Sequence, residues 1–162
     1  MKSLINKLFG KNKVYKGRTV DLVEKIKISE AIAYDGIPTV YYDIVLHNTN
    51  YKVGKCDLRL KLDDRMYYYG NVGYNIIEKE RGHHYAYHAC KVLFKIAKDE
   101  YKFNELYITC NPDNEASYKT LKKLKGELVE VAEIPEKHEL YSQGDRYKCV
   151  FRYKVDLNDR KD

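Results

Sequence analysis

The chain has 162 residues, which is enough for one domain whose hydrophobic core needs no disulfide or metal to hold it together. Its 30 basic residues are set against 24 acidic ones, so the net charge of +6 is modest. This mixture disfavours a dedicated nucleic-acid-binding protein and agrees with a solvated surface that has a mild preference for anionic ligands.

The N-terminus is basic and contains an apolar cluster, at positions 4–9, that is too short to be a secretion signal. We expect residues 1–18 to be a basic leader, residues 19–157 to form a single domain, and residues 158–162 to be a tail. No apolar run is long enough to cross a membrane.

The cysteines are far apart in the sequence and form no CxxC pair. Each falls on the apolar face of an expected strand or helix, and they are Cys56, Cys90, Cys110 and Cys149. We therefore expect buried free thiols in a protein of the reducing cytoplasm.

The first half of the chain reads as four strands. A first strand is expected over residues 20–28. Apolar and polar residues then alternate with a period of two over residues 40–46 and again over residues 55–62. The Asn-Thr-Asn segment at 48–50 is a turn signal, so these two strands are predicted to form an antiparallel hairpin. A fourth strand is expected over residues 72–77.

The second half begins with a helix from Tyr85 to about Asp99, which carries an apolar stripe opposite several lysines. A strand is expected over residues 106–110. A second helix should run from Asn114 or Glu115 to Lys125, with Gly126 as its C-terminal stop.

Two further strands are predicted over residues 128–134 and 147–155. The order is four strands, helix, strand, helix and two strands. This order predicts an α+β fold with a mostly antiparallel twisted sheet of six to seven strands and helices packed on it.

The segment from Arg81 to Ala86 is the most informative one. It joins a strand to the N-terminus of a helix through a basic, glycine-containing loop, so several backbone N–H groups point to one spot. The helix dipole adds positive charge there, and no Ser, Thr, Asp or Asn begins the helix to accept its first N–H groups. The site suits a phosphate or pyrophosphate.

The order of elements and the loop resemble the GNAT superfamily of acetyl-CoA-dependent N-acetyltransferases over about Val20 to Val155. The resemblance is strongest in residues 71–77, 81–86 and 111–117. The pyrophosphate loop of the family reads Gln/Arg-x-x-Gly-x-Gly/Ala. Arg81 and Ala86 match its ends, Gly82 matches a common extra glycine, and His84 replaces the usual central glycine.

The segment from Asn114 to Leu124 looks most like the branch that contains the ribosomal-protein N-terminal acetyltransferases. In many other members a Tyr at the position of Leu121 protonates the departing CoA thiolate, and that Tyr is absent here. In the resembling branch the position of Ser117 is the candidate thiolate donor. Tyr118 points about 100° away on a helix and is the alternative.

The resemblance implies acetyl-CoA as co-substrate, with the backbone of Tyr74 to Ile77 pairing with the pantetheine amides and an N–H near Ile76 polarising the thioester carbonyl. Glu78, or another carboxylate, would accept the amine proton through water. The implied acetyl-CoA-binding residues are Tyr74, Ile76, Ile77, Arg81, Gly82, His83, His84, Tyr85, Ala86, Asn111, Asn114 and Ser117. No metal is expected, because His84 and His88 have no marked third ligand.

The acceptor side departs from the family. One or two helices normally lie between the first two strands of the fold, whereas only residues 29–39 are available here. The resemblance therefore implies an acceptor site that is open on that side, or one closed by residues 133–146, which include Glu136, His138, Glu139, Tyr141 and Asp145.

Three functions stay open on the sequence alone. The leading hypothesis is an acetyl-CoA-dependent N-acetyltransferase in which a primary amine attacks the thioester directly. The altered loop and the absent Tyr leave room for a non-catalytic acyl-CoA-binding module on the same fold. A basic nucleic-acid-associated protein is the third class. The expected partners are acetyl-CoA, an unidentified amine acceptor and a second copy of the chain in a homodimer.

Overall fold

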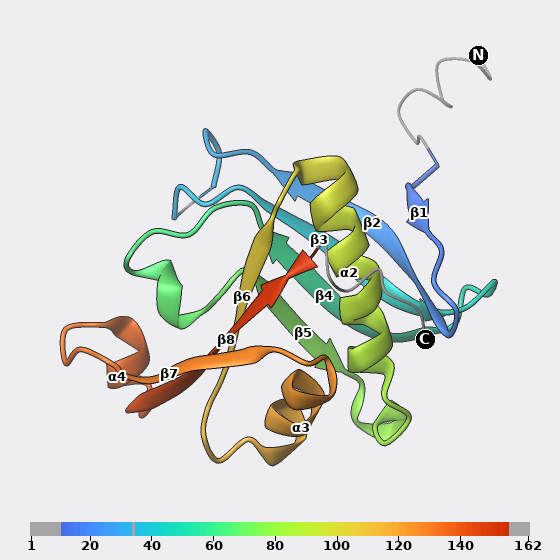
Figure 1. The fold of residues 1–162 in the computed structure, drawn as a ribbon. Coiled ribbons are helices and arrows are strands. Elements are labelled where there is room, and N and C mark those ends of the chain that lie inside the picture. Colours follow the sequence, from blue (N-terminus) through green and yellow to red (C-terminus); the bar gives the residue numbers. More distant parts are fainter. Residues whose placement is uncertain (1–10, 34, 156–162) are drawn as a thin grey trace.

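The computed structural model describes residues 11–33 and 35–155 (Figure 1). In these residues the strands form a five-stranded sheet of order β1-β2-β3-β4-β5 and a three-stranded sheet of order β6-β8-β7, with antiparallel pairing throughout each. The α+β class is confirmed, and the strands are divided between two sheets where one sheet of six to seven strands was predicted.

The five-stranded sheet follows the predicted alternation closely. Its strands are β1 (Val14–Tyr15), β2 (Val20–Ile28), β3 (Thr39–Leu46), β4 (Lys52–Arg59) and β5 (Val72–Ile76). The expected hairpin is confirmed, because β3 and β4 pair antiparallel around a turn in which Asn48 has φ of +59°. Asn tolerates this left-handed conformation better than most residues.

The expected leader is in part built into the fold. Val14 and Tyr15 pair with β2, so the sheet begins earlier than the sequence suggested. Lys16 reaches the buried carboxylate of Asp21 at 2.9 Å. Residues 1–10 and 156–162 lie outside the described part of the chain.

Helix α2 (Tyr85–Tyr101) lies across one face of the five-stranded sheet (Figure 1). Its predicted apolar stripe is buried, since Ala89, Cys90 and Leu93 have no exposed surface. It forms one core with the inward residues of β2, β3 and β4. In the described residues no helix is long and apolar enough to cross a membrane.

The second sheet and its helices complete the core. These elements are β6 (Glu105–Cys110), α3 (Glu115–Lys123), β7 (Glu127–Glu133), α4 (Glu139–Ser142) and β8 (Tyr147–Lys154). The predicted stop of α3 is wrong in detail, because Lys125 and not Gly126 takes the left-handed conformation. Gly126 has a different reason to be glycine, since a Cβ there would sit 2.4 Å from the ring of Tyr153.

The two sheets are joined where β5 begins, through the buried residue Asn71. Its backbone N–H donates to Tyr107 O at 2.6 Å, and its side-chain oxygen accepts from Tyr107 N at 2.9 Å. On the other side Arg59 N donates to Asn71 O, and Asn71 Nδ2 donates to Arg59 O. One residue thus links β4 with β6 and holds together the neighbouring ends of the two sheets.

Replacing Asn71 with Ala should lower the free energy of unfolding by about 2–4 kcal/mol, because it leaves the buried Tyr107 N–H without its side-chain acceptor and removes the bond to Arg59. Urea denaturation measures the loss. Asn75→Ala, at the exposed position of β5, is the control and should cost little. Equal losses in the two variants would contradict this role for Asn71.

Candidate functional site

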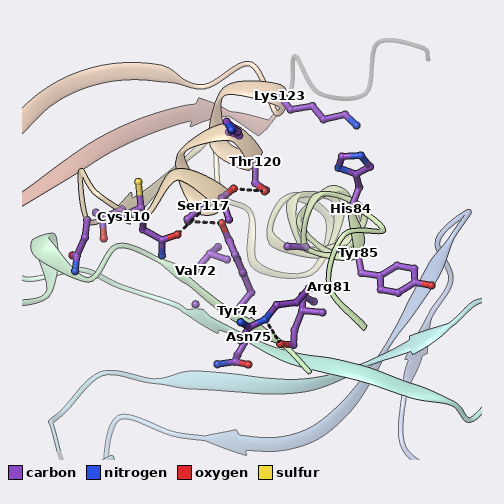
Figure 2. A pocket seen from close by; sticks show the side chains of 18 of the residues that line it. Val72, Tyr74, Asn75, Arg81, His84, Tyr85, Cys110, Ser117, Thr120 and Lys123 are labelled. Carbon is purple, nitrogen blue, oxygen red and sulfur yellow. Dashed lines mark hydrogen bonds between the residues drawn. The ribbon is translucent and has the colours of Figure 1, made fainter. Parts of the chain in front are cut away.

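A cavity of about 720 Å³ opens between β5 and β6, beyond the point where Asn71 joins the sheets. The N-terminus of α2 and one face of α3 complete its wall (Figure 2). Most of the predicted acetyl-CoA-binding residues line it, namely Tyr74, Ile76, Arg81, Gly82, His84, Tyr85, Ala86, Asn111, Asn114 and Ser117. Residues that are 40 positions apart in the sequence therefore share one hollow.

The backbone of β5 offers the cavity an unpaired edge. Ile77 N donates to Val53 O, so the N–H of Ile77 is used within the sheet. Because backbone groups of successive residues in a strand point to opposite sides, those of Tyr74 and Ile76 face away from β4 and towards the cavity. Arg81 Nε donates to Ile76 O at 3.2 Å and fixes the guanidinium beside this edge.

The loop before α2 has the geometry of an anion site. Gly82 has φ of +89°, and a Cβ built on it would meet no atom within 4 Å, so the loop leaves open space there. His84 precedes the helix in the left-handed conformation, and no side chain caps the helix at this residue. The absence of a cap that the sequence suggested is confirmed. The first N–H groups of a 17-residue helix thus face the cavity.

At the start of α3, Asn114 caps the helix by accepting from Ser117 N at 3.1 Å. The hydroxyl of Ser117 shares a hydrogen bond of 2.7 Å with the hydroxyl of Tyr74, which extends from β5 towards it (Figure 2). Burial raises the pKa of Tyr74 above its ordinary value, while the bond with Ser117 acts in the opposite direction. The two walls of the cavity therefore meet through a pair of hydroxyl groups.

Sequence reasoning missed the basic side chains on α3. Ser117, Thr120 and Lys123 recur at helical spacing and line the cavity together with Lys119. That period of three to four residues is visible in the sequence and could have revealed them. Lys123 lies on the same side of the cavity as His84 in Figure 2 and adds positive charge to the region before α2.

Cys110, at the end of β6, also lines the cavity. It stands directly opposite Cys149 in the register of β6 and β8, although the two are far apart in the sequence. Burial, reinforced by the neighbouring Cys149, raises the pKa of the Cys110 thiol to about 11. All four thiols are buried and free, which confirms that part of the prediction.

Some predicted residues do not reach the cavity. Ile77, Glu78 and His83 are not among the residues that line it. Glu80, two positions after Glu78, does line it. The ring of Tyr118 packs against Phe151 and not into the cavity. Among the described residues no three His, Cys, Asp or Glu side chains gather as a metal ion would need.

The sequence predicted an acceptor site that is open beside residues 29–39 or closed by residues 133–146. The described residues between β2 and β3 form turns, so no helix built from them covers the sheet face there. Residues 133–146 instead fold against the segment before β5, where His138 Nε2 lies 2.9 Å from Arg65 O and the His138 ring packs on Tyr68 and Tyr69. Asn111 donates to Asp145 at 2.8 Å and ties this segment to the cavity.

Solved structures share this fold at low identity. An acetyltransferase of the GNAT family from Bacillus anthracis has a TM-score of 0.57 and 18% identity, over 72% of this chain and 66% of that one. A ribosomal-protein-S5-alanine acetyltransferase from Vibrio fischeri has a TM-score of 0.58 and 20% identity, over 76% and 64%. The chain thus spans about two thirds of the length of these structures.

The ribosomal-protein acetyltransferase RimL in complex with coenzyme A matches over more of its length, with a TM-score of 0.63, 12% identity, and coverage of 89% of this chain and 99% of that one. No curated protein matches the sequence. The model of the GNAT acetyltransferase domain matches residues 15–127, which is well over half of the chain, and the protein therefore belongs to the GNAT acetyltransferase family.

Proposed function

We propose that the protein is an N-acetyltransferase that transfers the acetyl group of acetyl-CoA directly to a primary amine. The observation that carries this proposal is the cavity between β5 and β6. It joins an uncapped helix N-terminus, an unpaired strand edge and the hydroxyl of Ser117 in one hollow of about 720 Å³. These are the groups that a pyrophosphate, a pantetheine arm and a departing thiolate need.

Each group has a separate part in the reaction. The N–H groups at the start of α2, with Arg81 and Lys123 nearby, suit the pyrophosphate of CoA. The outward N–H and C=O groups of Tyr74 and the outward N–H of Ile76 suit the amides of pantetheine, as an added strand would pair with them. A backbone N–H of this edge would stabilise the negative charge that develops on the thioester oxygen.

The amine then attacks the carbonyl carbon, and the C–S bond breaks. Ser117 is proposed to give its proton to the thiolate that leaves, since its hydroxyl lies in the cavity wall. The proton lost by the amine needs an acceptor that water connects to the cavity. Glu78 stays a prediction for that role. Unlike Ser117, it does not line the cavity.

The acceptor is proposed to be a primary amine that approaches from the side of residues 133–146. The likeness to RimL and to the ribosomal-protein-S5-alanine acetyltransferase supports including a protein N-terminus among the acceptors to be tested. No helix of the described residues covers the sheet face beside the connection from β2 to β3, which leaves that face open to an acceptor. A free amino acid, an amino sugar and a polyamine complete the panel.

Acetyl-CoA at 100 times its dissociation constant should stabilise the protein by about 2.7 kcal/mol, which raises the melting temperature by roughly 5–10 °C. Thermal melts with acetyl-CoA and with acetate as control measure this shift. No shift at millimolar acetyl-CoA would remove the proposal. A shift without release of free thiol against any amine of the panel would favour the non-catalytic binding module.

Gly82→Val should weaken the binding of CoA at least tenfold, because a side chain there projects into the open space that the phosphate would occupy. Isothermal titration with CoA measures the effect. Gly36→Val is a matched control, since Gly36 also has a positive φ of +72° with no atom near its Cβ position but does not line the cavity. If both variants bind CoA as the unaltered protein does, the loop is not the phosphate site.

A further inference from the structure

We propose that the hydroxyl of Tyr74 supplies the proton that Ser117 passes to the departing CoA thiolate. This inference rests on the proposed acetyl transfer. It gives a tyrosine of β5 the task that a tyrosine on α3 performs in many relatives. Tyr74 acts through Ser117, so it also fixes the direction of the Ser117 hydroxyl.

The geometry of the two hydroxyls carries the proposal. Tyr74 Oη and Ser117 Oγ are 2.7 Å apart, and both residues line the cavity. Ser117 is held from behind because its N–H donates to the capping side chain of Asn114. Its hydroxyl is therefore free to accept one proton from Tyr74 while it donates its own into the cavity.

The other tyrosine rings near α3 pack away from the cavity. Tyr153 donates to Leu121 O at 2.7 Å in the core, and the ring of Tyr118 packs against Phe151 at 5.5 Å between ring centroids. Leu121, where many relatives have their tyrosine, is fully buried and does not line the cavity. A tyrosine that meets Ser117 from the opposite wall thus compensates for the one that α3 lacks.

A relay solves a chemical difficulty of serine as a lone donor. A thiolate is far less basic than an alkoxide, so a serine that gave up its proton alone would be left with an unfavourable charge. If the phenol proton moves to Ser117 as the Ser117 proton moves to sulfur, the charge comes to rest on a phenolate. Burial raises the pKa of Tyr74, so its phenolate is costly and must regain a proton from water as soon as the thiolate has been protonated.

The step balances as follows. The C–N bond forms, the C–S bond breaks, and the electron pair of the C–S bond remains on sulfur. Sulfur takes the Ser117 proton and Ser117 takes the Tyr74 proton. The attacking amine loses a proton to water, and the phenolate of Tyr74 recovers one from water, so no proton is gained or lost overall.

The test measures single-turnover release of CoA thiol, with enzyme in excess over acetyl-CoA and the best amine of the panel as acceptor. Tyr74→Phe should lower the rate about 10²-fold, the lower end of the usual range for general acid assistance, and leave the dissociation constant of CoA within twofold. Ser117→Ala should do the same, and Ser117→Thr should restore part of the rate. Tyr118→Phe is the matched control and should retain the rate.

Two readouts separate a proton relay from a structural contact. The double variant Tyr74→Phe/Ser117→Ala should be no slower than either single variant, because both changes break one chain. In mixtures of H₂O and D₂O the unaltered enzyme should show a curved dependence of rate on deuterium content, as two moving protons require. Tyr74→Phe should show a weaker effect.

The outcomes are decisive in each direction. A normal rate in Tyr74→Phe, or rate losses that multiply in the double variant, would overturn the relay while acetyl transfer stands. A linear isotope dependence in the unaltered enzyme would overturn it even if Tyr74→Phe failed to fold. If CoA binds and no amine releases thiol, acetyl transfer and the relay fall together.

Discussion

The geometry of the site depends on one buried amide. Asn71 is hydrogen-bonded to Arg59 at the end of β4 and to Tyr107 in β6. Together with the bridge between Gly70 and Ile108, it sets the distance between the two sheets beside the cavity. Beyond Asn71 the strands β5 and β6 separate. The outward backbone groups of β5 therefore have no strand to pair with and face the cavity. An aspartate could not replace Asn71, since it has no N–H to donate to Arg59 O.

Much of the fold could be predicted because its signals are local. The period-two alternation in β3 and β4 and the apolar stripe of α2 each follow from neighbouring residues. The loop from Arg81 to Ala86 could be identified in the same way, since a basic glycine loop and an uncapped helix lie within six consecutive residues. Such features do not depend on how distant segments meet.

The remaining features could not be predicted, because distant segments create them. The Tyr74–Ser117 contact joins positions 43 apart, and no pattern in either segment indicates it. Cys110 and Cys149 become neighbours only through the register of β6 and β8. Residue 126 is glycine because Tyr153 fills the space beside it, a constraint that comes from another strand. Likewise, two residues of the leader join the sheet only because β2 offers an edge.

Residues 133–146 are held at three buried points, Ile134, His138 and Leu140, with exposed residues between them. The anchors make this segment a rigid frame, while the exposed positions contribute almost nothing to the core. Changes at Glu136 or Lys137 therefore cost little folding energy. The segment is tied to the cavity through Asp145, so it presents beside the cavity a surface that can change with little effect on stability. Substitutions at these exposed positions can therefore accumulate without prior stabilising substitutions elsewhere in the protein.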